Sequence, residues 1–418
     1  MALLDMFLAR AINRGVLTVT YPDGSVRTFG KPDPELRPVA IRFTDKAAIR
    51  ALLRDPSVGT PEMYMAGRLV IDGDDVLGLL MVATANNRWE KGRNALDATA
   101  LGKTWEWLRY HTGRYNMTRR SKRNVAHHYD LSDRLYDLFL DADKQYSCAY
   151  FTDPANSLEQ AQDDKKAHIA AKLAIKPGMK VLDIGCGWGG MALYLHEKTG
   201  ADVLGVTLSE EQIKVARARA EAAGVADKVK FELIDYRNVT GAFDRIVSVG
   251  MFEHVGTPHY RTFFRKCRDL LTPEGVMLLH TIGRAGGPGV TDGFTAKYIF
   301  PGGYIPALSE IIRANEGLTW YVSDVEVLRL HYAYTLKHWY DRTVAARAAI
   351  VALYDERFFR MWTFYLAGSY VSFLNGSMIN YQFQFVRDRD ALPITRDYMV
   401  EDERKLRRSS VARAGREA

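Results

Sequence analysis

The sequence is poor in cysteine. Its 418 residues include only Cys148, Cys186 and Cys267, which lie far apart along the chain. No CxxC pair occurs, and no His or Cys stands at the spacing of metal ligands. We therefore expect neither a disulfide framework nor a metal site. The same scarcity favours a reducing compartment.

Long hydrophobic runs are also missing. Residues 1–15 begin apolar, but Asp5 and Arg10 interrupt them and no small-residue cleavage site follows, so we expect no signal peptide. The best apolar run, residues 361–374, is shorter than the roughly 20 residues that cross a bilayer. The sequence predicts a cytoplasmic protein that is soluble or peripheral to a membrane.

Basic residues exceed acidic ones, and the formal net charge is +7 at pH 7. Such a balance favours an anionic partner, either a nucleic acid or an acidic membrane surface, and charge alone does not choose between them. The 47% hydrophobic content and the length fit a large globular domain with a smaller one.

The first 85 residues mix strand-like and helix-like patterns. Residues 15–21 alternate as a strand, whereas 45–55 and 74–85 have helical periodicity, so we expect a small α+β domain here. Residues 105–124 then interleave aromatic and basic side chains. This segment is either a solvated linker with an amphipathic helix or a surface for phosphate-bearing headgroups.

Beyond Ser157 helices and strands alternate regularly. Capping boxes at Ser157/Gln160 and Ser209/Gln212 predict two helix starts. Buried-strand patterns occur at 179–184, 201–208, 228–234, 243–250 and 275–282. This order is typical of an α/β fold with a doubly wound, mostly parallel sheet. After residue 281 the pattern is mainly helical, and a charged C-terminal tail is expected to be mobile.

A glycine-rich turn leaves the first of these strands. Gly185, Gly187 and Gly189 would let a nucleotide-type ligand approach the backbone and the next helix N-terminus. With Gly190 the same letters also satisfy the dinucleotide pattern GxGxxG, which alone is weak. Asp183 lies two residues before the glycines, as in class I S-adenosylmethionine (SAM) methyltransferases. The following strand ends in Thr207 instead of an acid that would bind an NAD ribose, so SAM is favoured over NAD.

Further candidates stand at the ends of the later strands. Tyr236 and Arg237 follow the third strand, where such folds hold adenine, although an ordinary loop is the alternative. Glu253 lies at the tip of the fourth strand and is a candidate base or ligand. His280 lies at the carboxyl end of the fifth predicted strand and is expected to point toward the same ligand crevice. Taken singly, a surface pair for Glu253 and a core histidine for His280 are the simpler interpretations; together the two residues favour a site.

These blocks resemble the cyclopropane-fatty-acyl-phospholipid synthases and the mycolic-acid cyclopropane synthases. The residues that carry the resemblance are 127–151, 181–190, 205–212, 248–256, 278–283 and 297–306. They extend over the catalytic region, from about residue 124 to beyond 340. Residues 60–67, TPEMYMAG, look like part of the N-terminal domain of the phospholipid-acting members.

The resemblance implies a division of the chain and a function. It implies an N-terminal lipid-associated domain with its linker at 1–115, a Rossmann-like SAM methyltransferase domain with helical insertions at 116–395, and the charged tail at 396–418. The implied activity is SAM-dependent methylene transfer to the cis double bond of unsaturated phospholipid acyl chains. The implied setting is the inner face of an anionic membrane, with no nucleic acid partner, and a homodimer is allowed.

The resemblance also implies roles for individual residues. The cofactor residues would be Tyr146 and Ser147 near the SAM carboxylate, Asp183, Gly185, Gly187 and Gly189 along the glycine turn, Thr207, Leu208 and Gln212 around ribose and methionine, and Tyr236 and Arg237 near adenine. A bicarbonate ion would be held by Glu253, His280, Tyr332 and the main chain of Cys148 and Ile282. Cys148 is then no nucleophile, because the family uses only its backbone.

Two departures from the family pattern concern the acyl channel. Ser132 and Asp133 replace a Gly-Asn pair that many members carry, and the loop 283–294 is rich in glycine. Relatives on this scaffold quench the same cation without ring closure and produce methyl-branched, methylene or furan precursors. Methylation without ring closure is therefore the alternative outcome.

Overall fold

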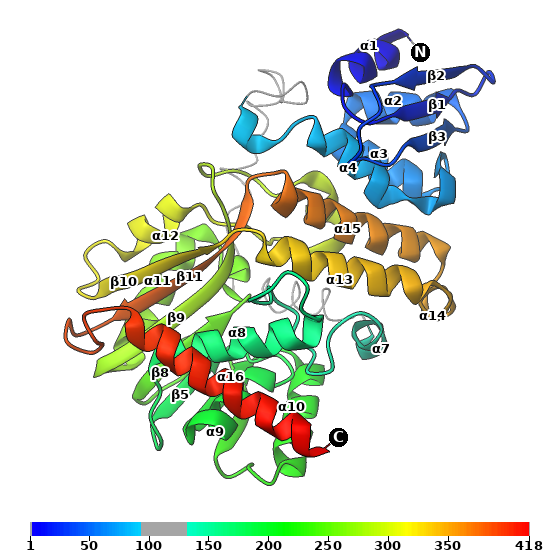
Figure 1. Ribbon diagram of the computed structural model, residues 1–418. Helices are drawn as coiled ribbons and strands as arrows, with labels where there is room; N and C mark the ends of the chain where they lie inside the picture. Colours follow the sequence, from blue (N-terminus) through cyan, green and yellow to red (C-terminus); the bar gives the residue numbers. More distant parts are fainter. Residues whose placement is uncertain (1, 93–131, 418) are drawn as a thin grey trace. The chain divides into compact units, whose positions relative to one another are not determined.

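The computed structural model describes residues 2–92 and 132–417, with side chains up to Arg407. It contains two compact units (Figure 1). The first combines Met1–His111, Val290–Pro301 and Ala333–Met378, and the second Thr112–Gly289, Gly302–Tyr332 and Ile379–Ala418. Neither unit is one continuous stretch, whereas the expected division had two boundaries, after residues 115 and 395.

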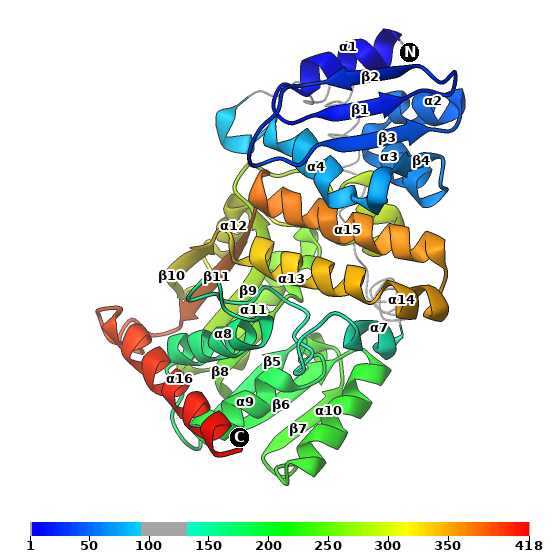
Figure 2. The same ribbon diagram turned by 45° about the vertical axis from the view of Figure 1, so that its right-hand side comes forward.

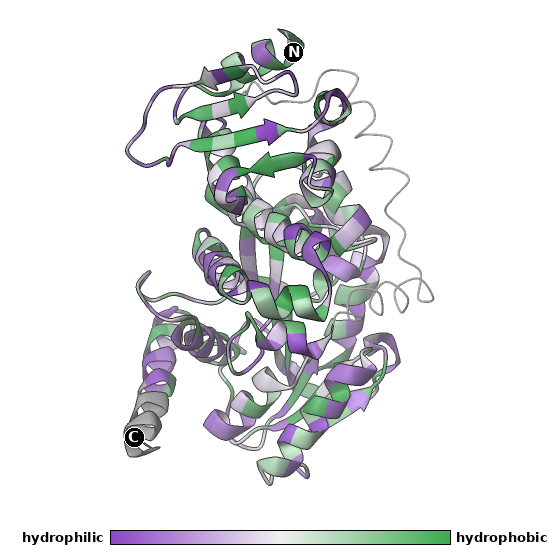
Figure 3. Ribbon diagram, turned by 90° about the vertical axis from the view of Figure 1, so that its right-hand side faces the viewer, coloured by the Kyte–Doolittle hydropathy of each residue, from purple (hydrophilic) through white to green (hydrophobic). Residues whose placement is uncertain are grey.

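The first unit contains a four-stranded sheet in the order β2-β1-β3-β4. Its strands are β1 (Leu17–Thr20), β2 (Val26–Phe29), β3 (Val39–Phe43) and β4 (Leu69–Ile71). Its N-terminal helices are α1 (Ala2–Ala11), α2 (Lys46–Arg54), α3 (Pro56–Met65) and α4 (Val76–Ala85). Figure 3 shows β1, β3 and β4 as largely hydrophobic, and their inward side chains are buried. The small α+β domain is confirmed.

Helices from later in the chain complete this unit. They are α14 (Arg347–Leu353), α15 (Glu356–Leu374) and most of α13 (His331–Ala345). The apolar run 361–374 lies in α15, which packs against α3 and α4. Within the described ranges, no helix is both long and apolar enough to cross a membrane.

The second unit contains a seven-stranded sheet in the order β10-β11-β9-β8-β5-β6-β7. The strands are β5 (Lys180–Ile184), β6 (Asp202–Thr207), β7 (Val229–Leu233), β8 (Phe243–Val249), β9 (Leu271–Arg284), β10 (Tyr321–Leu328) and β11 (Met378–Val386). Strands β5 to β9 pair in parallel, and β10 pairs antiparallel with β11. The expected doubly wound, mostly parallel sheet is confirmed.

Helices flank this sheet (Figure 2). They are α7 (Asp133–Asp137), α8 (Leu158–Leu173), α9 (Gly190–Thr199), α10 (Glu210–Ala222), α11 (Tyr260–Leu270), α12 (Leu308–Asn315) and α16 (Asp397–Glu417). Short 3-10 turns lie at Asp72–Asp74, Trp89–Lys91, Tyr236–Asn238, Phe252–His254 and Thr257–His259, and a π turn at Thr295–Ile299. Ser157 and Ser209 accept the amides of Gln160 and Gln212, so both predicted helix starts are confirmed.

The expectation of a mainly helical C-terminal third is confirmed by α12 to α16, but it missed two strands, and the expected mobile tail was wrong. Strands β10 and β11 lie within this region and complete the sheet beside β9. The charged tail is the helix α16, which packs against α8 through ion pairs such as Arg407–Asp164 at 2.8 Å. The aromatic and basic segment at 105–124 lies outside the described residues.

Candidate active site

The glycine turn joins β5 to α9. Gly185, Gly187 and Gly189 all have positive φ values, of 85°, 53° and 83°. An added Cβ at Gly185 would lie 2.8 Å from Met251 Cβ, and one at Gly189 would lie 2.6 Å from the Phe231 ring. At Gly187 an added Cβ would meet nothing within 4 Å, so the middle of the turn faces open space. The turn thus offers backbone to a ligand at the helix N-terminus.

Asp183 precedes this turn at the end of β5. It is buried, and its Oδ2 has no hydrogen-bond partner among the described residues. Burial raises the pKa of Asp183 to about 7, against an opposing effect from the charge of Lys165. A buried carboxylate oxygen without a donor is costly, so this atom is suited to receive a donor from a ligand.

The end of β6 presents Thr207, Leu208 and, from the first turn of α10, Gln212. The Thr207 hydroxyl donates to Gln212 Oε1 at 3.3 Å and accepts the Ser209 amide at 3.2 Å. Thr207 and Gln212 are buried, and Leu208 is partly exposed. The structure therefore brings these three predicted residues together beside the glycine turn, since β6 is the parallel neighbour of β5.

The end of β7 carries Tyr236 and Arg237. Asp235 accepts both the Arg237 amide and its guanidinium, at 3.0, 2.9 and 2.6 Å. The Tyr236 ring packs edge-on against Phe263, which in turn contacts Phe252 beside Glu253. Tyr236 thus forms part of a wall that continues to the next strand end. The guanidinium of Arg237 is already paired within its own loop.

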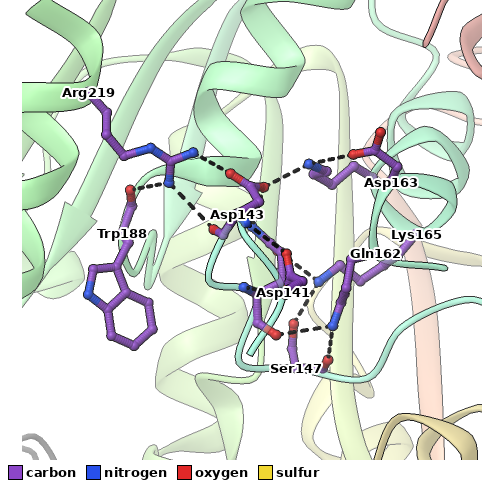
Figure 4. Close-up of polar contacts among 10 residues, drawn as sticks. Asp141, Asp143, Ser147, Gln162, Asp163, Lys165, Trp188 and Arg219 are labelled. Atoms are coloured by element: carbon purple, nitrogen blue, oxygen red, sulfur yellow. Dashed lines mark hydrogen bonds and ion pairs between the residues drawn. The ribbon is translucent and has the colours of Figure 1, made fainter. Parts of the chain in front are cut away.

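The loop at 141–148 is fastened to α8 by buried polar contacts (Figure 4). Lys165 Nζ donates to Gln145 Oε1 and Ser147 Oγ, both at 2.8 Å. Gln162 Nε2 donates to the main-chain oxygens of Gln145 and Ser147 at 3.1 and 3.0 Å. Asp143 pairs with Lys166 at 2.7 Å and with Arg219.

This network also reaches the glycine turn. Arg219 donates to Trp188 O at 2.9 Å (Figure 4), and an added Cβ at Gly190 would lie 2.4 Å from Asp143 Oδ2. Ser147 is on the opposite side, where its Cβ lies 3.8 Å from the Cβ position of Gly250. The loop is therefore held between the glycine turn and the segment that carries Glu253.

Tyr146 and Cys148 flank Ser147 in this loop. The Tyr146 ring contacts Tyr136 and Phe139 edge-on, with centroids 5.3 and 6.1 Å apart. Cys148 is 1% exposed, and its Sγ lies 3.3 Å from Ala149 O. A thiol buried against its own backbone fits a structural side chain better than an attacking nucleophile.

Glu253 lies in the 3-10 turn after β8. Ile282 N donates to Glu253 Oε1 at 2.6 Å, and Glu253 Oε2 is buried with no hydrogen-bond partner among the described residues. Burial raises the pKa of this carboxyl above its usual range, while the Ile282 hydrogen bond lowers it. The structure thus brings the predicted pair Glu253 and Ile282 into direct contact.

His280 lies two residues before Ile282 on β9 and is 1% exposed. Asn380 Nδ2 lies 2.7 Å from its Nε2, and Gln382 Nε2 lies 3.1 Å from its Nδ1. Burial lowers the pKa of His280 well below the usual value, so the ring is neutral. Its main-chain oxygen accepts the Gly250 amide at 2.9 Å, which links it to the Glu253 segment.

Tyr332, at the start of α13, is placed by its neighbour His331. Phe151 N donates to His331 Nδ1 at 2.9 Å, and Tyr150 stacks on His331 and on His168 with centroids 4.8 and 4.1 Å apart. Burial lowers the pKa of His331 to about 4, as a ring that accepts a hydrogen bond requires. The start of α13 is thereby tied to the segment that carries Cys148.

Some residues of this site escaped the sequence interpretation. Lys165 and Gln162 stand in a charged stretch that resembles a solvated helix face, yet both are buried. The available signal was their position on the stripe of Leu158 and Ile169, at helical spacing. The amides around His280 were missed because β11 was not recognised as a strand.

The carboxyl ends of β5 to β9 therefore lie along one edge of the sheet. They carry the glycine turn, whose middle faces open space, and the buried carboxylates of Asp183 and Glu253. These residues fit SAM, because the middle of the glycine turn faces open space and the nearby Asp183 Oδ2 is a buried acceptor without a donor among the described residues. When bound, SAM supplies an electrophilic methyl group. Fold and site define a class I SAM-dependent methyltransferase.

The particular family follows from comparison with known proteins. Residues 116–383 match the family model described as mycolic acid cyclopropane synthetase. This match covers more than half of the chain, so the chain belongs to that family. Residues 3–89 match a separate model, DUF7884, which is described as a domain of unknown function.

Individual relatives agree with this assignment. The cyclopropane-fatty-acyl-phospholipid synthase of Escherichia coli strain K12 is 39% identical over 332 residues, which cover 79% of this chain and 83% of that protein. A probable fatty acid methyltransferase of Pseudomonas putida is 41% identical over 289 residues, covering 66% and 73%. The structure of the mycolic acid cyclopropane synthase CmaA1 complexed with SAH and CTAB superimposes with a TM-score of 0.60 at 33% identity, and covers 63% of this chain and 98% of that one.

Proposed function

We propose that the chain transfers a methylene group from SAM to the cis double bond of unsaturated phospholipid acyl chains and so forms cyclopropane fatty acids. The observation that carries the proposal is Glu253, which is buried in the turn after β8 with one oxygen bound by Ile282 and the other without a partner among the described residues. The name of the Escherichia coli relative supports the substrate and the product.

The chain's residues would serve this chemistry by positioning and by excluding water. An alkene is a weak nucleophile, so the glycine turn and the loop at 141–148 must hold the methyl donor in line with the double bond. Methyl transfer leaves a carbocation that water would quench. Aromatic rings near the crevice can stabilise this cation through their π faces. A base must then remove a proton from the added methyl group so that the ring closes.

We further propose that bicarbonate is this base. Glu253 Oε2 would accept the hydrogen bond of the bicarbonate hydroxyl, while Tyr332 and the main chain at Cys148 would complete its surroundings. Ile282 N and both His280 nitrogens already have partners within the chain, so a bound anion would compete for them. We therefore expect His280 to border the anion in a fixed orientation.

The setting that we propose is the cytoplasmic face of an anionic membrane. The net charge of +7 supports it, and the cations Arg119, Arg120, Lys122 and Arg123 in the segment outside the described residues are the candidates for surface contact. Each contributes about 1 kcal/mol near an anionic surface, screened by salt. Binding to anionic vesicles should weaken as salt rises and when these four residues are neutralised. Vesicle binding that is unchanged by salt and by neutralisation of the four residues would place the membrane contact elsewhere. Whether the protein forms a homodimer is a separate question, which light scattering would answer.

The product is tested with SAM that carries a fully deuterated methyl group. Ring closure removes one deuterium from the transferred methyl, so mass spectrometry of the lipid should find two retained. Methylation that ends in a methyl-branched alkene, which the name of the Pseudomonas putida relative favours, would retain all three. A methylene branch would retain two but leave a double bond in the chain. Two retained deuteriums in a chain without a double bond is the expected result; three, or two with a double bond, would overturn the ring closure while leaving the SAM chemistry in place.

The cofactor is tested independently of the lipid. A ligand that binds only the folded state stabilises it by mass action, by about 2.7 kcal/mol at a hundred times its Kd. SAM should therefore raise the melting temperature by several degrees, and NAD at the same concentration should leave it unchanged. Stabilisation by NAD without any by SAM would contradict the assignment of the glycine turn.

A further inference from the structure

Lys165 is an ammonium group enclosed in the second unit. It lies on α8 with no exposed surface, and burial lowers its pKa to about 8. Its two neutral partners, Gln145 Oε1 and Ser147 Oγ, both belong to the loop beside the glycine turn (Figure 4). Enclosing a charge whose hydrogen-bond partners are neutral is costly, so packing alone does not explain it.

The contact with Ser147 has a direction. An ammonium group only donates, so Ser147 Oγ must be the acceptor of this hydrogen bond. The single hydroxyl hydrogen of Ser147 must therefore point away from Lys165. Gln162 also donates to the main-chain oxygen of the same residue at 3.0 Å, so the backbone that carries Ser147 is held as well. The hydroxyl is a donor oriented before any ligand arrives.

The other charged residues of the network do not account for the buried ammonium group. Asp143, in the same loop, is paired with Lys166 and Arg219 and does not form an ion pair with Lys165. The charges of Asp141 and Asp143 raise the pKa of Lys165, and the charge of Lys165 lowers that of Asp183, yet no ion pair joins Lys165 to any of these carboxylates among the described residues. The positive charge therefore remains available to an anionic group that approaches Ser147.

We propose that Lys165 is a positioning residue for the carboxylate of the methyl donor, which it orders by fixing Ser147 as a hydrogen-bond donor and by contributing a buried positive charge. This inference rests on the proposed function, because it takes Ser147 to face the methionine end of SAM. It adds a residue outside the strand ends to the cofactor site. It also explains why a lysine occupies the apolar stripe of α8.

The test compares SAM with decarboxylated SAM, which keeps the sulfonium and the amino group and lacks only the carboxylate. Calorimetry of the full chain without lipid gives both affinities, and their ratio is the measured quantity. The wild-type protein should prefer SAM. Lys165→Met should reduce the SAM affinity by about tenfold or more, as expected for a hydrogen bond to a charged group, with little change for decarboxylated SAM. The preference should therefore collapse.

Lys172→Met is the matched control. Lys172 is a second buried lysine on α8, but it pairs with Glu326 and has no contact with the 141–148 loop among those described. This variant should lose stability and keep the preference for SAM. A folded Lys165→Met variant that keeps the wild-type preference would overturn the proposal.

Ser147→Ala covers the case in which Lys165→Met does not fold. It removes the oriented hydroxyl and leaves the lysine in place, so it should also lower the preference for SAM. In the double variant the two effects should be less than additive, because both act on one hydrogen bond. Full preference in Ser147→Ala would refute the mechanism. Failure of the wild-type protein to bind SAM at all would instead refute the proposed function.

Discussion

The second unit contains two groups of buried charged side chains, and they differ in whether the chain supplies all of their hydrogen-bond and ion-pair partners. On the outer side of α8, His168 lies 2.8 Å from Glu403 and 2.7 Å from Glu326, and Lys172 also pairs with Glu326. At the carboxyl ends of β5 and β8, Asp183 and Glu253 each keep one buried oxygen without a partner among the described residues. The first group is closed by the chain itself, and the second is left open.

The difference separates structural charge from ligand-binding charge. In the closed group every carboxylate has a cation or a donor, so its burial is compensated. In the open group burial raises the pKa of both carboxyl groups, which means that the folded chain alone does not satisfy them. A ligand with donors can supply what is missing. Perturbed carboxyl groups in a crevice are typical of functional sites.

The largest effect is expected from changing the open group at Glu253. Glu253→Gln keeps the shape but replaces the acceptor oxygen, so a hydrogen-bond donor on the base is no longer held. Product formation should fall by at least about a hundredfold, as when a preorganised polar group is removed. SAM affinity should stay near wild type. Cys148→Ser is the control and should keep much of the activity; a dead but folded, SAM-binding serine variant would make the thiol catalytic.

The next effect is expected from opening the closed group at Glu326. Burial alone would raise the pKa of Glu326, but the hydrogen bond from His168 and the charge of Lys172 outweigh it and lower this pKa. Glu326→Gln should therefore cost roughly 3 kcal/mol of unfolding free energy at pH 7. An acid with a lowered folded pKa stabilises above its unfolded pKa, so the difference from wild type should shrink as the pH falls below about 4. Denaturant unfolding measures it, with exposed Glu232→Gln as the control. Equal loss at all pH values would contradict the ionic origin.

Asp183→Asn should change the free energy of unfolding in the opposite direction to Glu326→Gln. The folded pKa of Asp183 is raised to about 7, so its ionisation between the unfolded value near 4 and pH 7 destabilises the ligand-free protein. The asparagine variant should gain on the order of 2 kcal/mol over wild type at pH 8, with weaker SAM binding, and gain nothing near pH 4.

The matched variant is Asp143→Asn, at a carboxylate that is closed in the same sense because the chain pairs it with Lys166 and Arg219. Burial would raise the pKa of Asp143, but Lys166 and Arg219 outweigh it and lower this pKa. This substitution should therefore destabilise the protein at pH 8. The same sign of change in both variants would remove the distinction between open and closed carboxylates.

The smallest effect is expected at the start of α8, which carries residues of the closed group. Ser157 Oγ accepts the Gln160 amide at 3.2 Å, and Ser157→Ala should cost about 1 kcal/mol of unfolding free energy. Ser157→Asp keeps an acceptor at the cap and should retain most of the stability. A neutral alanine variant would indicate that packing against α16 alone fixes this end of the helix.

The sequence allowed the parallel part of the sheet and most strand-end residues to be predicted, because apolar runs, capping boxes and glycine turns are local signals. Strand β11 was missed although its amides alternate with Tyr381 and Phe383 at the period of a strand, because the whole region was interpreted as helical; that the amide face, Asn380, Gln382 and Gln384, is buried as well could not be predicted. Strand β10 escaped because its apolar side chains, such as Val325, are exposed at the sheet edge.

The ion pairs between α8 and α16 also could not be predicted from the sequence. Arg407 pairs with Asp164, and Glu403 with His168, across more than 230 positions. No local periodicity marks such a partner, so an acidic and basic tail was taken for a mobile one. The hydrogen bond from Ile282 N to Glu253 was not predicted, because the resemblance implied only that both residues hold a bicarbonate ion; the bond depends on the strand order β8-β9 and on a side chain that folds back over it.

The order of the strands also constrains synthesis. β11 lies between β9 and β10, although the ribosome releases it after both. Until residue 386 has emerged, β9 has an unpaired edge and β10 has no neighbour to join, and α16 emerges later still. Unpaired strand edges invite pairing with other chains. A nascent chain that stalls before β11 would therefore be a target for chaperones, and the catalytic unit reaches its final pairing only when nearly all of the protein has left the ribosome.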